Sequence, residues 1–200
     1  EVAPRAAERE AETKQARTHV DEGAKYAQQG NLDAAIAEFT KAIQIDPKLV
    51  DAYVGRATAH SLAGSTDDAV ADFEKAIELN PNYAGAYLGR GLLHQKNGEV
   101  VMAIADFSEV IRLRPELAEA YSHRAAAYSG QGELDAAIAD YTHVLELQPN
   151  HAAAYFSRGA AYNKLGNLQK AISDYSDAIR LQPGMEVAHF YRGSAYYISG

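Results

Sequence analysis

The chain repeats itself at a fixed step of 34 residues. The repeating prolines are Pro47, Pro81, Pro115, Pro149 and Pro183, and the repeating glycines are Gly30, Gly64, Gly98, Gly132, Gly166 and Gly200. The same step separates the alanines Ala35, Ala69, Ala103, Ala137 and Ala171, the aromatic residues Phe39, Phe73, Phe107, Tyr141 and Tyr175, and the tyrosines Tyr53, Tyr87, Tyr121 and Tyr155. A period of about 20–50 residues predicts a fold made by stacking one structural unit many times.

Each unit carries the pattern of two helices. In residues 33–44 the apolar side chains recur at steps of three and four, which places them on one face of a helix that we call helix B. Between a proline and the next glycine, Tyr53, Ala57 and His60 have the same spacing and form helix A. Glycine ends helix A because it tolerates the left-handed backbone, and proline ends helix B because it lacks an N–H group. One hairpin cannot bury its own apolar stripe, so the units must stack.

The order of residues in the unit resembles the tetratricopeptide repeat family over roughly residues 16–200. That order is a small residue, a tyrosine, a glycine, an alanine, an aromatic residue, an alanine or valine, and a proline. Two departures occur: His19 and His189 replace a large aromatic residue early in helix A, and His60 and His94 replace a tyrosine later in it. The resemblance implies an all-α fold, a right-handed superhelical α-solenoid of helix-turn-helix repeats, that binds other proteins.

The residues that recur every 34 positions form columns, and these columns also predict the organisation of the chain. Residues 1–15 alternate charged residues with alanine and are expected to form a polar helical extension before the repeat domain, residues 16–200. The predicted repeats are 16–49, 50–83, 84–117, 118–151 and 152–185, followed by a partial sixth repeat, 186–200.

Composition excludes several classes of protein. A formal net charge of −8 and the absence of a Lys/Arg cluster argue against a nucleic-acid partner, because that affinity depends on neutralising phosphates. There is no run of eighteen apolar residues, so direct membrane insertion is not expected. With no cysteine, the chain fits a cytoplasmic location and a periplasmic or secreted one, after signal removal, equally well.

No residue pattern indicates catalysis. The chain has seven histidines, and no two of them lie three to five residues apart, so the usual spacing of paired metal ligands is missing. Among them His123 is expected to face the binding groove. A phosphate-binding glycine loop and a nucleophile elbow are also missing from the sequence. We therefore expect no enzyme activity, no cofactor and no metal.

Two charged columns predict a ladder of ion pairs. The arginines are Arg56, Arg90, Arg124, Arg158 and Arg192 of helix A, and the acids are Glu38, Asp72, Asp106, Asp140 and Asp174 of helix B. Pairing within a unit would oppose Glu22 with Glu38 and leave Arg192 without a partner. Pairing across the junctions joins Arg56 to Glu38 and gives each later arginine one acid, ending with Arg192 and Asp174. No arginine or acid of the two columns is then left unpaired. We therefore predict ion pairs across the junctions. The alternative interpretation is that these residues are solvated surface charges that form no ladder.

The A helices are expected to line a concave surface that binds a peptide or protein segment. The predicted contact residues are Val54, Leu88, Leu92, Gln95, His123, Phe156, Asn163, Phe190 and Tyr191. The alternative interpretation of Phe156 and Phe190 is that they pack between neighbouring helices.

The sequence thus predicts a non-enzymatic scaffold or adaptor whose partner is a protein or peptide. The last helix is unusually apolar for a terminal repeat, with Phe190, Tyr196, Tyr197 and Ile198 in one short stretch. Either the natural chain continues past Gly200 or this helix docks on another surface. The alternative function is therefore self-assembly into a homo-oligomer through the C-terminal helix, and a third hypothesis is a regulatory domain of a larger enzyme.

Overall fold

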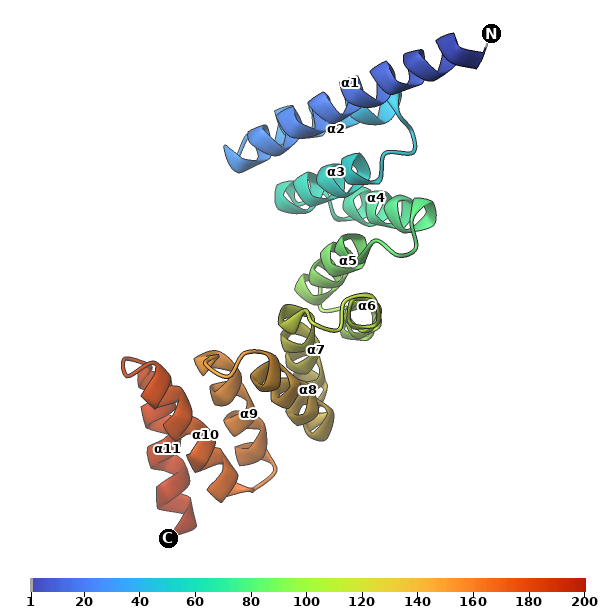
Figure 1. Cartoon of the computed structure of the whole chain (residues 1–200). Helices are drawn as coiled ribbons and strands as arrows, with labels where there is room; N and C mark the ends of the chain where they lie inside the picture. The colour runs from blue at the N-terminus through green and yellow to red at the C-terminus, as the bar shows by residue number, and fades with distance from the viewer. Residues whose placement is uncertain (1) are drawn as a thin grey trace. The chain divides into compact units, whose positions relative to one another are not determined.

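The computed structural model describes residues 2–200, and their side chains from Glu10 onward. This part of the chain consists of α-helices joined by short turns (Figure 1). The helices are α1 (Val2–Gln28), α2 (Leu32–Ile45), α3 (Val50–Ala63), α4 (Thr66–Leu79), α5 (Ala84–Lys96), α6 (Val100–Leu113), α7 (Ala118–Gln131), α8 (Leu134–Leu147), α9 (Ala152–Lys164), α10 (Leu168–Leu181) and α11 (Glu186–Ser199). The predicted all-α solenoid fold is confirmed, and no described helix is long and apolar enough to cross a bilayer.

The helices end where the repeating residues predict. Gly64 has a left-handed backbone (φ 86°), and its N–H donates to the carbonyls of His60 and Ser61. At the end of α2, Asp46 is extended (φ −128°, ψ 94°) because it precedes a proline. Asn31 begins α2 by accepting a hydrogen bond from the N–H of Ala34, which satisfies one of the free donors at the helix start.

The chain forms two compact units, residues 1–93 and residues 94–200. In unit 1, α1 packs on α2, α2 on α3 and α3 on α4; in unit 2, α6 to α11 pack in the same consecutive way. The helix α1 is continuous, so the extension predicted for residues 1–15 and the first helix A belong to one helix. Glu1 and the side chains of residues 2–9 lie outside the described residues, and the division at residue 15 stays a prediction.

Each B helix buries one aromatic residue at the centre of its hairpin. Phe73 and Phe107 are 1% and 0% exposed, and Tyr175 is also fully buried. Around Phe73 lie Tyr53 and small residues of the same unit such as Ala57 and Ala69. The alanine and aromatic columns are therefore the core.

A further column of residues lies on helix A, sixteen positions after each of these aromatic residues. The size of its side chains determines how closely this helix A approaches the aromatic ring of the preceding helix B. This column contains Gly55, whose added Cβ would lie 2.4 Å from Cε1 of Phe39, and later His123, whose ring stacks on Phe107 at 5.4 Å. The column therefore changes from glycine in unit 1 to larger side chains in unit 2.

The ion pairs form within the hairpins, which corrects the prediction. Arg158 donates from Nε and Nη2 to the two carboxylate oxygens of Asp174, both at 2.8 Å, and Arg124 binds Asp140 in the same geometry. Arg56 binds Asp72 likewise. The predicted pairings Arg56–Glu38, Arg124–Asp106 and Arg158–Asp140 are therefore wrong. Asp72 and Asp174, which the prediction pairs with Arg90 and Arg192, are bound by Arg56 and Arg158 instead.

The arginines still connect neighbouring hairpins, but through hydroxyl groups. Nη1 of Arg158 donates to Oγ1 of Thr142 on the preceding helix B at 3.0 Å, and Arg124 donates to Ser108 at the same distance. The hydrogen bonds to Asp174 are the main cause that raises the pKa of Arg158. Each guanidinium of this kind thus joins an acid of its own hairpin to the hairpin before it.

Candidate functional site

A small pocket opens on the A-helix side of unit 2. Its volume is about 150 Å³, which is enough for one side chain of a partner. The lining residues are Ser129 of α7, Leu134 and Tyr141 of α8, and Phe156, Ser157, Ala160, Ala161 and Lys164 of α9. Two A helices and the B helix between them therefore form one hollow.

The pocket combines apolar walls with a few polar groups. Burial raises the pKa of Tyr141, and hydrogen bonds with Ser157 and Ser129 partly oppose this rise. The hydroxyl of Tyr141 is therefore neutral at physiological pH and held by two serines. Lys164 is exposed and adds a positive charge to the pocket lining. Apolar walls with a few positioned polar groups are typical of ligand pockets.

Aromatic residues continue this surface toward the C-terminus. The ring of Phe156 lies 5.7 Å from that of Tyr175 and 5.9 Å from that of Tyr191, and Phe190 packs on Tyr191 at 5.6 Å. Phe190 is nevertheless 72% exposed. Among the described residues the hydroxyl of Tyr175 has no hydrogen-bond partner, and burial raises the pKa of this group to about 12. Phe156 thus belongs to a packed cluster, whereas the side chain of Phe190 is largely exposed.

The other predicted contact residues divide between the two units. In unit 1, Val54 is half-buried and packs against the core around Phe73, and Leu88 and Leu92 are also half-buried. In unit 2, Nδ1 of His123 lies 3.0 Å from Oε1 of Gln95. Asn163, on α9, is half-buried. These contacts within the chain do not test whether the residues bind a partner, so their binding role stays a prediction.

Sequence reasoning missed Tyr141 and Ser129 as pocket residues because it assigned the aromatic column wholly to the core. A signal was present, since this column changes from phenylalanine at Phe39, Phe73 and Phe107 to tyrosine at Tyr141. Most buried tyrosine hydroxyls have a polar partner, which points to the serines beside Tyr141.

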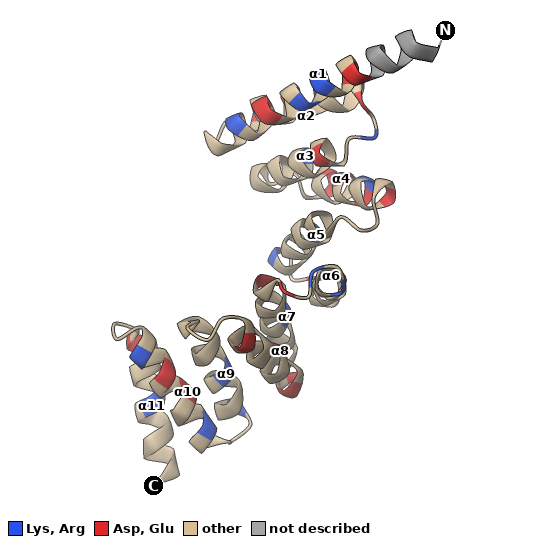
Figure 2. Ribbon diagram, in the orientation of Figure 1, with Lys and Arg blue, Asp and Glu red and all other residues tan. Residues whose placement is uncertain are grey.

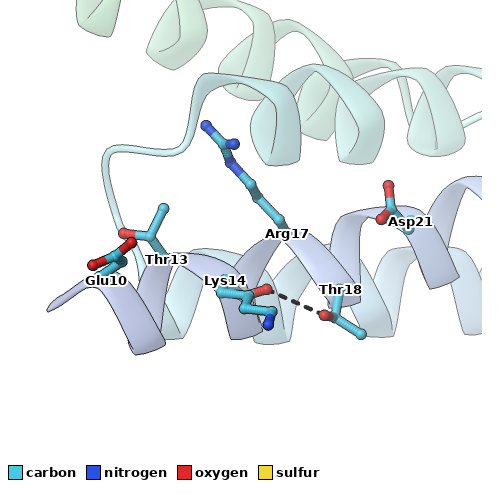
Figure 3. Close-up of a pocket in the computed structure, with 6 residues that line it drawn as sticks. All are labelled: Glu10, Thr13, Lys14, Arg17, Thr18 and Asp21. Atoms are coloured by element: carbon cyan, nitrogen blue, oxygen red, sulfur yellow. Dashed lines mark hydrogen bonds between the residues drawn. The ribbon is translucent and has the colours of Figure 1, made fainter. Parts of the chain in front are cut away.

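A second hollow lies along α1 and has a different character. It is lined by Glu10, Thr13, Lys14, Arg17, Thr18 and Asp21, all from this one helix. Figure 3 shows that Arg17 and Lys14 extend in opposite directions, and the one hydrogen bond drawn joins Thr18 to the carbonyl of Lys14. Because these groups do not converge, the hollow is a polar stretch of helix surface.

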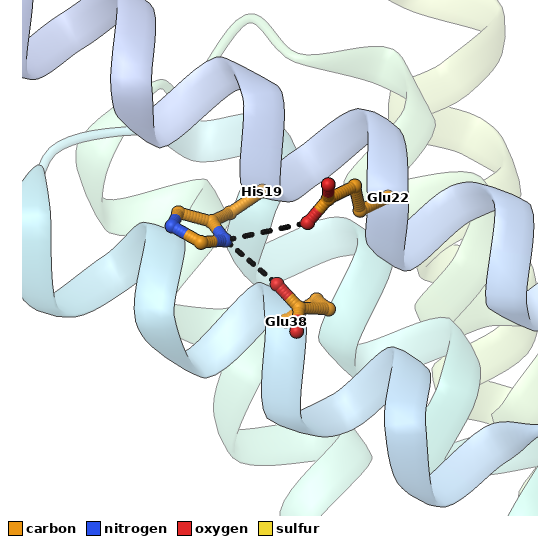
Figure 4. Close-up of side chains that lie close together, drawn as sticks. All are labelled: His19, Glu22 and Glu38. Carbon is orange, nitrogen blue, oxygen red and sulfur yellow. Dashed lines mark hydrogen bonds and ion pairs between the residues drawn. The ribbon is translucent and has the colours of Figure 1, made fainter.

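Three side chains of unit 1 could hold a metal ion. His19 and Glu22 of α1 meet Glu38 of α2, and one ring nitrogen of His19 faces both carboxylates (Figure 4). Nδ1 of His19 lies 2.6 Å from Oε2 of Glu38 and 3.7 Å from Oε2 of Glu22. Hydrogen bonds from Lys41 and then from His19 lower the pKa of Glu38. The sequence did not indicate this cluster, because Glu38 comes nineteen residues after His19 and on another helix.

Charge is mixed over the molecule. Figure 2 shows both basic and acidic residues in each unit, scattered among many uncharged ones.

Comparisons with known proteins agree with this architecture. Family models described as "TPR repeat" match residues 23–64 and 62–98, and one described as "Tetratricopeptide repeat" matches residues 123–186. No curated protein sequence matches the chain. The solved structure of MamA protein is 26% identical, with a TM-score of 0.77 over 85% of this chain and 93% of MamA.

Two further solved structures share the fold. YrrB, described as a TPR protein with an unusual peptide-binding site, is 23% identical, with a TM-score of 0.77 over 96% of this chain and 98% of YrrB. TTC0263, a TPR protein of Thermus thermophilus, is 20% identical, with a TM-score of 0.60 over 91% of this chain and 99% of that protein. The matched ranges carry the periodic columns and the helical hairpins described above, and the chain belongs to the tetratricopeptide repeat family.

Proposed function

We propose that this chain is a non-enzymatic scaffold that binds an extended peptide on the A-helix side of unit 2. The observation that supports this most directly is the pocket of about 150 Å³ beside Phe156, with Tyr141, Ser157 and Lys164 in its lining. One apolar side chain of the peptide fills the pocket, and an acidic neighbour reaches Lys164. Interaction with proteins is the general role of tetratricopeptide repeats, and YrrB shows that the same fold carries a peptide-binding site in that protein.

The neighbouring aromatic residues support the same surface. Phe190 is 72% exposed next to the packed ring of Tyr191. Exposed aromatic side chains beside a small pocket are favourable anchors, because they bury much apolar area with few rotatable bonds. The peptide therefore runs from the pocket on α9 toward Phe190 on α11.

Filling the pocket tests this function. Peptides selected by display on the wild-type chain should bind the Ala160→Trp variant at least about tenfold more weakly, because the indole occupies the pocket (a loss of about 1.4 kcal/mol or more). Affinity is measured by fluorescence anisotropy with the selected peptides. The matched control is Ala153→Trp, because Ala153 is an exposed residue of the same helix outside the pocket.

Circular dichroism should show that both variants keep the helical content of the wild type. Equal affinity of the selected peptides for the wild type and for both variants would place the binding surface elsewhere. Selection of peptides without an apolar residue next to an acidic one would contradict the assigned chemistry of the pocket.

The exposed face of α11 favours a second candidate function, self-assembly. Tyr197 is 90% exposed, and Tyr196 and Ile198 are 56% and 62% exposed. In a homo-oligomer a second copy covers this apolar face. We expect light scattering to show a mass that increases with concentration, and Tyr197→Ala to shift the chain toward monomer. Leu62→Ala, at a 64% exposed position of α3, is the control that should change nothing. A strict monomer at high concentration excludes this candidate.

A further inference from the structure

The first hairpin lacks the ion pair that the later hairpins use. Where Arg158 faces Asp174 in α9 and α10, the equivalent positions of α1 and α2 are Glu22 and Glu38. Two carboxylates thus meet at a place where the other hairpins join opposite charges. Glu38 binds Lys41 and His19, and a cation shared by both carboxylates would relieve the repulsion that remains between them.

His19 completes a set of metal-binding donors. The three ligand atoms, Nδ1 of His19 and one carboxylate oxygen each of Glu22 and Glu38, all lie within 4.8 Å of one another. Ligands about 2.0–2.1 Å from a tetrahedral zinc ion lie roughly 3.3 Å apart. The distances from Nδ1 to the two carboxylates, 2.6 and 3.7 Å, bracket this value. Small side-chain rotations would therefore bring the three atoms to coordinating distance.

The surroundings suit a site for a metal ion. The side chain of Glu38 is 12% exposed, and its other oxygen, Oε1, accepts a hydrogen bond from Nζ of Lys41 at 2.7 Å. Lys41 thus fixes the carboxylate and leaves Oε2 directed at His19, as outer partners of metal ligands commonly do. The side chain of Glu22 is 54% exposed, which gives an ion access from solvent and leaves room for a water ligand.

We propose that His19, Glu22 and Glu38 bind a zinc ion that links α1 to α2. One imidazole nitrogen with two carboxylates suits zinc, whereas magnesium and calcium prefer ligand sets made only of oxygen. The bound ion neutralises the opposed carboxylates and holds the first helix A on its hairpin. This site is independent of the peptide surface in unit 2.

Titration of the whole chain with zinc chloride, followed by calorimetry, tests the proposal. We expect one site in the wild type and binding at least about tenfold weaker in Glu22→Arg. This substitution introduces the residue type that the later hairpins use, so the new guanidinium would pair with Glu38 and the fold should be retained. His19→Gln is the second variant and should lose affinity to a similar extent.

Two controls separate this site from surface binding. His143 and Glu146 form an exposed pair at 3.1 Å on one helix, so His143→Gln removes a competing surface ligand and should leave the titration unchanged. Magnesium chloride should not compete with zinc. Cobalt(II) should give the visible absorption of a four-coordinate site in the wild type but not in Glu22→Arg. Absence of zinc binding to the wild type, or equal binding by the wild type and both site variants, overturns the proposal.

Discussion

Replacing Arg158 by methionine is expected to lower the free energy of unfolding by about 3–5 kcal/mol. Arg158 binds both oxygens of Asp174, and the side chain of Asp174 is only 6% exposed. The variant leaves this carboxylate buried without a counter-charge, which costs more than the ion pair itself contributes. The guanidinium also stacks over the ring of Tyr155, at 5.7 Å, and that contact is lost as well. Urea denaturation followed by circular dichroism measures the change.

A double-mutant cycle identifies the partner of Arg158. Replacing both Arg158 by Met and Asp174 by Leu should recover most of the lost stability, because an apolar pair of similar volume leaves no buried charge. Combining Arg158→Met with Asp140→Leu should instead give two penalties that add, since Asp140 is bound by Arg124. A strong coupling of Arg158 with Asp140, and none with Asp174, would contradict the pairing within the hairpin.

The sequence alone placed these pairs wrongly because both candidate acids lie at similar distances along the chain. For Arg158, Asp174 is sixteen residues ahead and Asp140 eighteen residues behind. The number of charged residues left unpaired at the ends of the array favours Asp140, whereas the structure pairs Arg158 with Asp174. In the structure Glu38 binds His19 and Lys41, so an acid without an arginine is not left unpaired.

A column of hydroxyl residues could have corrected the prediction. Thr142 and Ser108 occur sixteen residues before Arg158 and Arg124, and each accepts a hydrogen bond from its arginine. Ser176 has the same relation to Arg192, at 3.3 Å. Because a hydroxyl group binds one side of each arginine, the carboxylate must bind the arginine from the other side. Which side each group occupies depends on how the helices pack, and helical periodicity does not contain that information.

The repeat itself was predictable, because every unit carries the same types of residue at the ends of its helices. Glycines such as Gly64 and the extended residues before the prolines end the helices where the sequence indicates. The pocket beside Phe156 was only partly predictable, since its shape depends on side chains from three helices. The cluster around His19 escaped prediction for the same reason: two of its ligands are neighbours in the sequence, and the third comes from the next helix.

Replacing Gly55 by alanine is expected to destabilise the chain, although alanine is normally favoured over glycine within a helix by about 1 kcal/mol. The added Cβ would lie 2.4 Å from Cε1 and 2.5 Å from Cζ of Phe39. Phe39 is 3% exposed, so its ring cannot move away without repacking the core. Overpacking of this kind costs about 1–3 kcal/mol, which exceeds the gain in helix propensity. Urea denaturation measures the sign of the change.

The matched control is Gly193→Ala in α11, where no described atom beyond the neighbouring residues and backbone of that helix lies within 4 Å of the added Cβ. This variant should be more stable than the wild type by about 0.5–1 kcal/mol, because only the helix propensity changes. Adding Phe39→Leu to Gly55→Ala should recover part of the lost stability, since the smaller side chain leaves space for the new methyl group. If Gly55→Ala stabilised the chain as Gly193→Ala does, the close approach of α3 to the ring of Phe39 would be refuted.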